Sequence, residues 1–279
     1  MSGLWNNTKT TLLMGALMGL CLGIGYLIGG PHAMIYAFLF GGVINLIMFF
    51  FSDKIALATM HAQEIGPKDD PSLWRIVEEL SQRAHLPMPR VYISPAAAPN
   101  AFATGRGPHH AAVCVTAGLR QMLNDNELRG VLGHELSHVK NRDVLIGTIA
   151  AVMAGAITML TRFVFWGGGD NERRANPLIA IALMILAPIA ALIIQMAISR
   201  SREYEADRSG AELAGDPESL ARSLQKLESA NQRIPLPVPD AQSSLFIVQP
   251  LTGGDLRKLF STHPPTEERI ARLMAMERH

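Results

Sequence analysis

The sequence predicts an α+β protein, in which four transmembrane helices carry a mainly helical cytosolic domain with a small β-sheet. Three observations support this prediction. Long apolar runs recur along the chain and gather much of its 48% hydrophobic content. The stretches between them alternate helical and strand patterns. One of the predicted helices bears two histidines four residues apart, which is the spacing of a metal site.

The apolar runs cover residues 11–30, 33–52, 144–165 and 177–199. Each has about 20 residues, and at ~1.5 Å per residue a helix of this length crosses ~30 Å of hydrocarbon. One such run is also typical of a buried core helix, but four in so short a chain favour a membrane protein. A signal peptide at 11–30 is disfavoured, because the run is long and the second run begins almost at once.

The four runs pair into two hairpins, the first joined by Pro31-His32 and the second by a Gly-rich loop at 167–176. The predicted domains are therefore an N-terminal transmembrane hairpin, a first cytosolic part, a second transmembrane hairpin and a second cytosolic part, at 1–54, 55–143, 144–199 and 200–279. Basic residues are more frequent beside the two soluble parts than on the far side. The positive-inside rule then places both soluble parts in the cytoplasm.

Composition limits the remaining classes of function. The formal net charge is +1, which gives no sign of a nucleic-acid partner. The chain has two cysteines, Cys21 and Cys114, and Cys21 lies in an apolar run. A disulfide framework is therefore not expected, in agreement with a soluble part that faces a reducing compartment.

The soluble parts carry clear helix and strand signals. A helical apolar pattern covers Ser72 to Ala84, and strands are expected at Arg90 to Ile93 and Ala111 to Thr116, on either side of a turn-rich stretch. Asn124 and Glu127 form a capping box, which predicts a helix from Asn124 to Lys140. Asp216-Pro217 opens a later helix, and a loop or hairpin is expected at 234–254.

The predicted helix from Asn124 contains His134-Glu135-Leu136-Ser137-His138. Because residues i and i+4 share one face of a helix, both imidazoles can reach one ion. Glu135 then lies beside that ion, where a carboxylate can take a proton from metal-bound water. This spacing is typical of zinc peptidases.

A catalytic zinc takes three protein ligands, so the third must lie outside this helix. The residues after His138 exclude the histidine-rich metzincin arrangement, and Glu203 is the better candidate. Glu203 and Asp207 form another i, i+4 pair, of which one carboxylate can bind the ion while the other fixes a ligand imidazole. The alternative is an ordinary charged end of a membrane helix. Packing of the runs at 144–165 and 177–199 would bring the two elements together.

These residues resemble the HtpX family, membrane-bound zinc endopeptidases of bacteria, and more distantly the CAAX prenyl endopeptidases. The resemblance covers nearly the whole chain and includes the motifs that start at Asn100 (Asn-Ala-Phe-Ala-Thr-Gly) and Thr262 (Thr-His-Pro-Pro). It implies a gluzincin-type metalloprotease domain with one Zn²⁺ per chain. The implied zinc ligands are His134, His138 and Glu203, with Glu135 as general base and acid and Asp207 behind the ligands. It also implies that His263 supports the oxyanion, whereas sequence alone favours an exposed loop histidine.

The resemblance further implies cleavage of damaged or misassembled membrane proteins, under stress, in the bacterial inner membrane. The expected partners are thus polypeptide substrates and the lipid bilayer, with no nucleic acid; the oligomeric state is not predicted. Two alternatives are less favoured. An intramembrane protease would need its zinc helix inside the bilayer, where the charged neighbours of this helix are costly. A scaffold with a structural zinc would need closed coordination, usually by cysteines.

Substrate contacts are predicted on a strand. Val113, Cys114 and Val115 lie in a segment that is either an exposed edge strand, to which an extended substrate adds by main-chain hydrogen bonds, or an internal strand. Asn100, Ala101 and Phe102 either line the same groove or shape a turn. Cys114 is expected to be a small apolar residue rather than a nucleophile, since no Cys–His arrangement is evident.

Overall fold

The computed structural model describes residues 2–145, 148–149, 200–233 and 264–276. Over these residues it is mainly helical, with one small mixed sheet, as the sequence predicts. The elements follow in the order α1 (Ser2–Thr59), β1 (Gln63–Ile65), α2 (Pro71–Ala84), β2 (Arg90–Ser94), β3 (Ala101–Gly105), η1 (Pro108–His110), β4 (Ala111–Thr116), α3 (Ala117–Met122), α4 (Asp125–Asn141), α7 (Arg200–Ala214), α8 (Pro217–Arg233) and α10 (Thr266–Met276).

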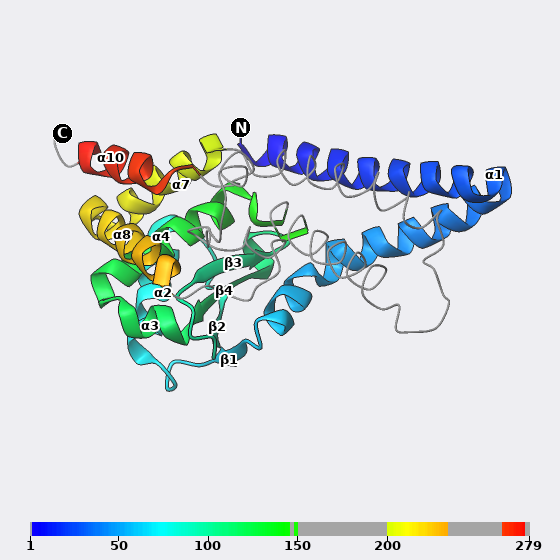
Figure 1. The fold of residues 1–279 in the computed structure, drawn as a ribbon. Helices are drawn as coiled ribbons and strands as arrows, with labels where there is room; N and C mark the ends of the chain where they lie inside the picture. The colour runs from blue at the N-terminus through cyan, green and yellow to red at the C-terminus, as the bar shows by residue number, and fades with distance from the viewer. Residues whose placement is uncertain (1, 146–147, 150–199, 234–263, 277–279) are drawn as a thin grey trace.

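Helix α1 doubles back on itself and forms two arms that extend away from the rest of the described structure (Figure 1). The reversal lies at Gly30, which has a φ of 64°, next to Pro31. Glycine adopts this left-handed conformation without a Cβ clash, and proline has no N–H to continue the helical ladder.

One helical segment among the described residues, Gly30–Thr59, is long and apolar enough to cross a membrane. Many of its large apolar side chains are exposed on the surface; Tyr36 and Phe40, for example, are 74% and 68% exposed. The described part of the chain therefore does not confirm four spans. The predicted hairpin at 144–199 lies almost entirely outside the described residues, as does the predicted loop at 234–254.

The sheet has the strand order β1-β2-β4-β3. Strand β4 is parallel to β2 and antiparallel to β3. Every residue of β4 is buried, because both faces of the sheet are covered. Val113 and Val115 belong to the main core, which α2, α4 and α8 complete, whereas Cys114 belongs to a smaller cluster under the end of α1.

This order decides between the two alternatives for β4 and corrects the prediction that Val113, Cys114 and Val115 contact the substrate. Hydrogen bonds to β2 and β3 occupy both sides of β4, so the internal-strand alternative is the one observed. Val113, Cys114 and Val115 are fully buried and have no free main-chain edge for a substrate. The edge strands are β1 and β3, and β3 lies in the stretch for which the sequence predicts turns.

The capping signals predicted from sequence are present. The Asn124 side chain accepts hydrogen bonds from the Asn126 and Glu127 N–H groups, and Glu127 accepts one from the Asn124 N–H. This capping box fixes where α4 begins. Helix α8 begins as predicted, with the Ser219 N–H donating to Asp216 at 2.9 Å.

Candidate metal centre

Helix α4 places His134 and His138 on one face, one turn apart. Their Nε2 atoms lie 3.2 Å apart, and the two rings are nearly perpendicular at 88°. His134 is 1% exposed, while His138 remains partly open. Both imidazoles therefore direct the same kind of nitrogen to one point.

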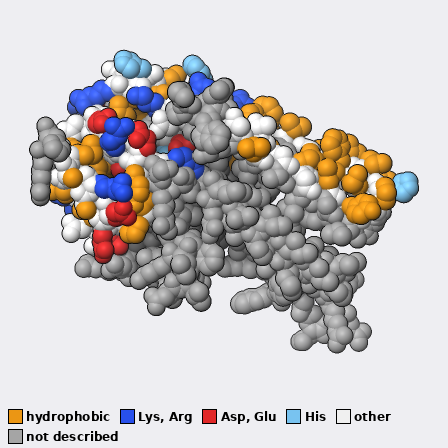
Figure 2. Space-filling view, turned by 90° about the horizontal axis from the view of Figure 1, so that it is seen from above, with side chains coloured by type: hydrophobic (Ala, Val, Ile, Leu, Met, Phe, Trp, Pro, Cys, Tyr) orange, Lys and Arg blue, Asp and Glu red, His pale blue; other side chains and the backbone are white. Residues whose placement is uncertain are grey.

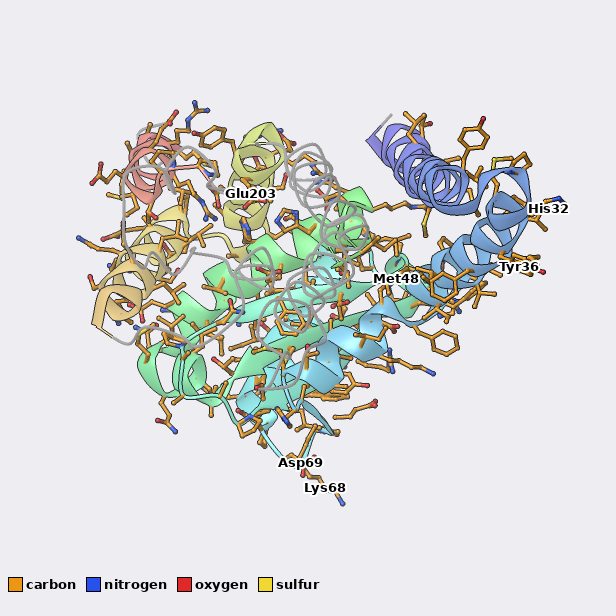
Figure 3. All side chains as sticks on the ribbon, turned by 45° about the vertical axis from the view of Figure 1, so that its right-hand side comes forward. His32, Tyr36, Met48, Lys68, Asp69 and Glu203 are labelled. Atoms are coloured by element: carbon orange, nitrogen blue, oxygen red, sulfur yellow. The ribbon has the colours of Figure 1, made fainter. Side chains whose placement is uncertain are left out.

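Glu203 on α7 completes this cluster (Figure 3). Its two carboxylate oxygens lie 3.8 Å from His134 Nε2 and 3.7 Å from His138 Nε2. One ligand atom from each of the three residues can be chosen so that all lie within 4.8 Å of one another. Ligand atoms at 2.0–2.1 Å from one tetrahedral ion would be about 3.3 Å apart, so small side-chain movements suffice to close the set.

Two glycines allow α7 to approach α4 closely enough for this convergence. A Cβ built on Gly210 would lie 2.5 Å from the His134 backbone nitrogen, and one on Gly133 would lie 2.6 Å from the Gly210 carbonyl oxygen. Contacts this short are not possible for real Cβ atoms. The crossing point of α4 and α7 therefore requires glycine at both positions.

Behind His134 lies a buried chain of charges. Asp207 Oδ1 is 2.9 Å from His134 Nδ1, and Arg269 on α10 donates to both Asp207 oxygens at 2.8 and 2.7 Å. Asp207 and Arg269 are 3% and 1% exposed. Burial alone raises the pKa of Asp207, but the Arg269 guanidinium and His134 hold it well below its usual range. The carboxylate is thus ionised and can fix the His134 tautomer.

His138 has an equivalent partner that sequence reasoning missed. Its Nδ1 lies 3.2 Å from each carboxylate oxygen of Asp143, which is 6% exposed. Burial lowers the pKa of His138, but Asp143, together with Glu203 and Glu135, outweighs burial and raises this pKa to about 10. The cluster thus favours positive charge at this point. Asp143 follows the αL residue Arg142 that ends α4, so only the turn brings its side chain back to His138.

Glu135 is buried beside the two histidines. The Ala103 N–H of β3 donates to Glu135 Oε2 at 2.8 Å. Burial raises the pKa of Glu135, and the neighbouring His134 and His138 oppose this rise. A carboxylate with a raised pKa holds a proton more readily than an exposed one, which suits a group that must accept a proton and release it.

The predicted substrate residues lie on or next to two neighbouring strands, β4, which is described above, and β3. Ala101 and Phe102 lie in β3, the edge strand that leads to the Glu135 contact, and Asn100 directly precedes it. All three are buried. The Asn100 N–H donates to Thr116 Oγ1, and its carbonyl accepts from the Thr116 N–H; these bonds join the start of β3 to the end of β4. His263 lies outside the described residues.

The donor set fits zinc. Two histidine imidazoles and a carboxylate from a second structural element are the ligands of many catalytic zinc sites. Each imidazole has its other nitrogen beside a buried carboxylate, the usual support for a ligand histidine. Among the described residues, the cluster consists of these two imidazoles and one carboxylate.

Comparison with known proteins agrees with this geometry. The model of peptidase family M48 matches residues 67–277. The chain belongs to peptidase family M48. This M48 chain is 52% identical to the protease HtpX homolog of Burkholderia cenocepacia (strain HI2424), over 99% of its own length and 98% of the relative. It is 50% identical to the protease HtpX homolog of Methylibium petroleiphilum, over 98% of each chain.

The fold has a relative among solved structures. Ste24p of S. mikatae superposes with a TM-score of 0.53 over 98% of this chain and 67% of that chain, at 19% sequence identity. At this identity the likeness concerns the fold alone. Family membership makes the chain a metalloprotease, and the predicted resemblance to HtpX is confirmed.

Proposed function

We propose that this M48 metalloprotease is an integral membrane zinc endopeptidase that cleaves misfolded or damaged membrane proteins. The convergence of His134, His138 and Glu203 beside Glu135 carries the proposal. The proposed cellular location is the bacterial inner membrane, with both soluble parts of the chain in the cytoplasm. The open apolar arm of α1 supports the membrane placement, and the HtpX relatives support the class of enzyme.

In the proposed site, His134, His138 and Glu203 would hold zinc, while Asp207 and Asp143 orient the two imidazoles. When bound, zinc supplies a Lewis acid that polarises the scissile carbonyl and activates water near neutral pH. Glu135 accepts the proton of the attacking water and passes it to the leaving amine. His263 is the proposed donor to the developing oxyanion.

Strand β3 is the proposed substrate platform. Its outer edge is the end of the sheet, and Ala103 on this strand contacts Glu135 directly. An extended polypeptide added along β3 by main-chain hydrogen bonds would pass the Glu135 carboxylate. Main-chain recognition gives grip with little demand on side-chain sequence, as a protease for damaged proteins requires.

The decisive experiment is the Glu135→Gln variant, purified in detergent. We expect it to retain wild-type zinc content and to lose cleavage of casein, since the amide cannot accept the proton. His134→Ala is the matched comparison, because it should lose both zinc and cleavage. Undiminished turnover by Glu135→Gln would contradict the proposed mechanism. Zinc retained without any chelator-sensitive cleavage in the wild type would instead favour a structural zinc site.

A further inference from the structure

Basic side chains gather where the second arm of α1 meets the soluble body. Lys54 lies at the end of the exposed apolar surface of this arm, with its Nζ 5.2 Å from the centroid of the Phe51 ring. Arg106, from the turn between β3 and β4, lies 5.1 Å above the Phe50 ring. A pocket of about 700 Å³ lies between them. We call these residues and this pocket the α1 collar.

Glycines fix the turn that holds Arg106 in the collar. Gly105 has a φ of +123°, and a Cβ at this position would lie 2.1 Å from the His110 carbonyl oxygen. The short helix η1 (Pro108–His110) follows at once. The turn is therefore built tightly back on itself and does not depend on the Arg106 side chain, which is exposed.

Positive charge dominates the collar. Lys54, Arg90 and Arg106 line the pocket together with His109 and His110. Asp53 is the one carboxylate among the described lining residues, and Arg90 already pairs with it at 3.2 Å. On the far side of the turn, Arg106 and Arg142 line a second pocket of about 330 Å³. An anionic group in the collar would find two basic side chains, Lys54 and Arg106, that have no acidic partner at ion-pair distance among the residues that the structure describes.

The apolar surface continues directly from the collar along α1. Phe50 and Phe51 line the pocket and are each 46% exposed. Further along the arm, Leu39 and Phe40 are exposed by 60% and 68%, and Figure 2 shows hydrophobic side chains gathered over this arm. Cations beside a long apolar surface match a ligand that has both a negative head and apolar chains.

We propose that the α1 collar binds the phosphate group of an anionic phospholipid, whose acyl chains lie along the exposed arm of α1. The planar guanidinium of Arg106 can donate two hydrogen bonds to phosphate oxygens, while Lys54 adds a point charge. The aromatic rings of Phe50 and Phe51 hold these cations at the boundary of the apolar surface. The inference rests on the proposed membrane placement of α1 and does not depend on the zinc chemistry.

The test is lipid binding by the full-length chain in neutral detergent. Phosphatidylglycerol is titrated, and bound lipid is counted by native mass spectrometry for wild type and for Lys54→Gln/Arg106→Gln. Each basic residue near a lipid surface contributes about a fivefold change in binding, so the double variant should bind about 25-fold more weakly. Binding of phosphatidylcholine should be weak in both proteins.

The matched control is Lys68→Gln/Arg75→Gln, which removes the same charge from exposed positions. Lys68 lies at a loop tip away from the arms of α1 (Figure 3). An equal loss in this control, or equal binding of phosphatidylcholine, would overturn the proposal in favour of general charge or apolar adsorption. Equally tight binding of water-soluble glycerophosphoglycerol would also overturn it, because the arm would then contribute nothing. Zinc content and casein cleavage are measured on the same samples, so that failure of the lipid proposal can be distinguished from failure of the proposed protease function.

Discussion

Arg269 offers the most direct test of how this fold supports its metal centre. Its guanidinium donates two hydrogen bonds to Asp207, at 2.8 and 2.7 Å, and both side chains are almost completely buried. Asp207 in turn lies 2.9 Å from His134 Nδ1. Substitution of Arg269 by Met keeps much of the side-chain volume but leaves the Asp207 charge buried and unpaired.

Two effects of Arg269→Met follow from this geometry. Loss of one partner of a buried ion pair destabilises a protein by about 3–5 kcal/mol. Because Asp207 is then free to turn away from His134, zinc affinity should also fall by about 10–100-fold, as expected when the support of a ligand histidine is lost. Zinc affinity is measured by competition with a chromophoric chelator, and stability by thermal unfolding in detergent with and without zinc.

A double-mutant cycle isolates the pathway through Asp207. If Arg269 acts on zinc only through this carboxylate, Arg269→Met/Asp207→Asn should bind zinc as weakly as Asp207→Asn alone. Arg222→Met is the control, because Arg222 forms an exposed pair with Glu218 on α8, and such pairs contribute about 0–1 kcal/mol. Additive losses in the double variant, or wild-type zinc affinity in Arg269→Met, would refute the reasoning.

Three further predictions concern the scaffold. Gly210→Ala should push α7 away from α4, since the new Cβ would lie 2.5 Å from the His134 backbone nitrogen, and zinc binding should be lost. The control Gly66→Ala should bind zinc normally, because its new Cβ would contact only Asp69, at 3.6 Å. Cys114 should resist iodoacetamide at pH 8 in the folded protein, because burial raises the pKa of its thiol to about 12; peptide mass mapping that finds native Cys114 alkylated would contradict this. Burial raises the pKa of Asp70, but Arg120 and the Leu73 N–H outweigh burial and lower it overall. Because the pKa of Asp70 is lower in the folded state, its ionised carboxylate stabilises the fold at pH values above the unfolded pKa of about 3.9. This stabilisation is lost as the pH falls towards the folded pKa. Asp70→Asn should therefore be less stable than wild type at pH 6, and the gap should close towards pH 3; a pH-independent gap would be inconsistent with this origin.

Local signals in the sequence were sufficient for the parts of the site that lie on one helix. Asn124 and Glu127 mark the start of α4, and the four-residue spacing of His134 and His138 sets them on one face. A capping box acts over one turn, so its effect does not depend on the rest of the fold. Glu203 was also predicted, because it directly follows the fourth apolar run and forms an i, i+4 pair with Asp207.

Strand β3 and the position of β4 were beyond the sequence reading. Ala101–Gly105 has small residues and lies in a turn-rich stretch, so its strand structure depends on pairing with β4. The apolar run of β4 is equally compatible with an edge and an interior strand. Its interior position follows from β2 and β3 lying on either side, which is a property of the whole sheet.

The sequence by itself determined the chemistry of this protein, because the identity and helical spacing of the zinc-ligand candidates and Glu135 are local properties. Only the tertiary structure decided which groups support them. Asp143 reaches His138 through a turn, and Arg269 reaches Asp207 from a helix 62 positions away in the sequence. Neither separation carries a periodic signal, and the close approach of α7 to α4, which brings Glu203 to the two histidines, requires Gly133 and Gly210. The physical reason is that burial and long-range charge pairing are decided by packing, whereas capping and helical spacing are decided within a few residues.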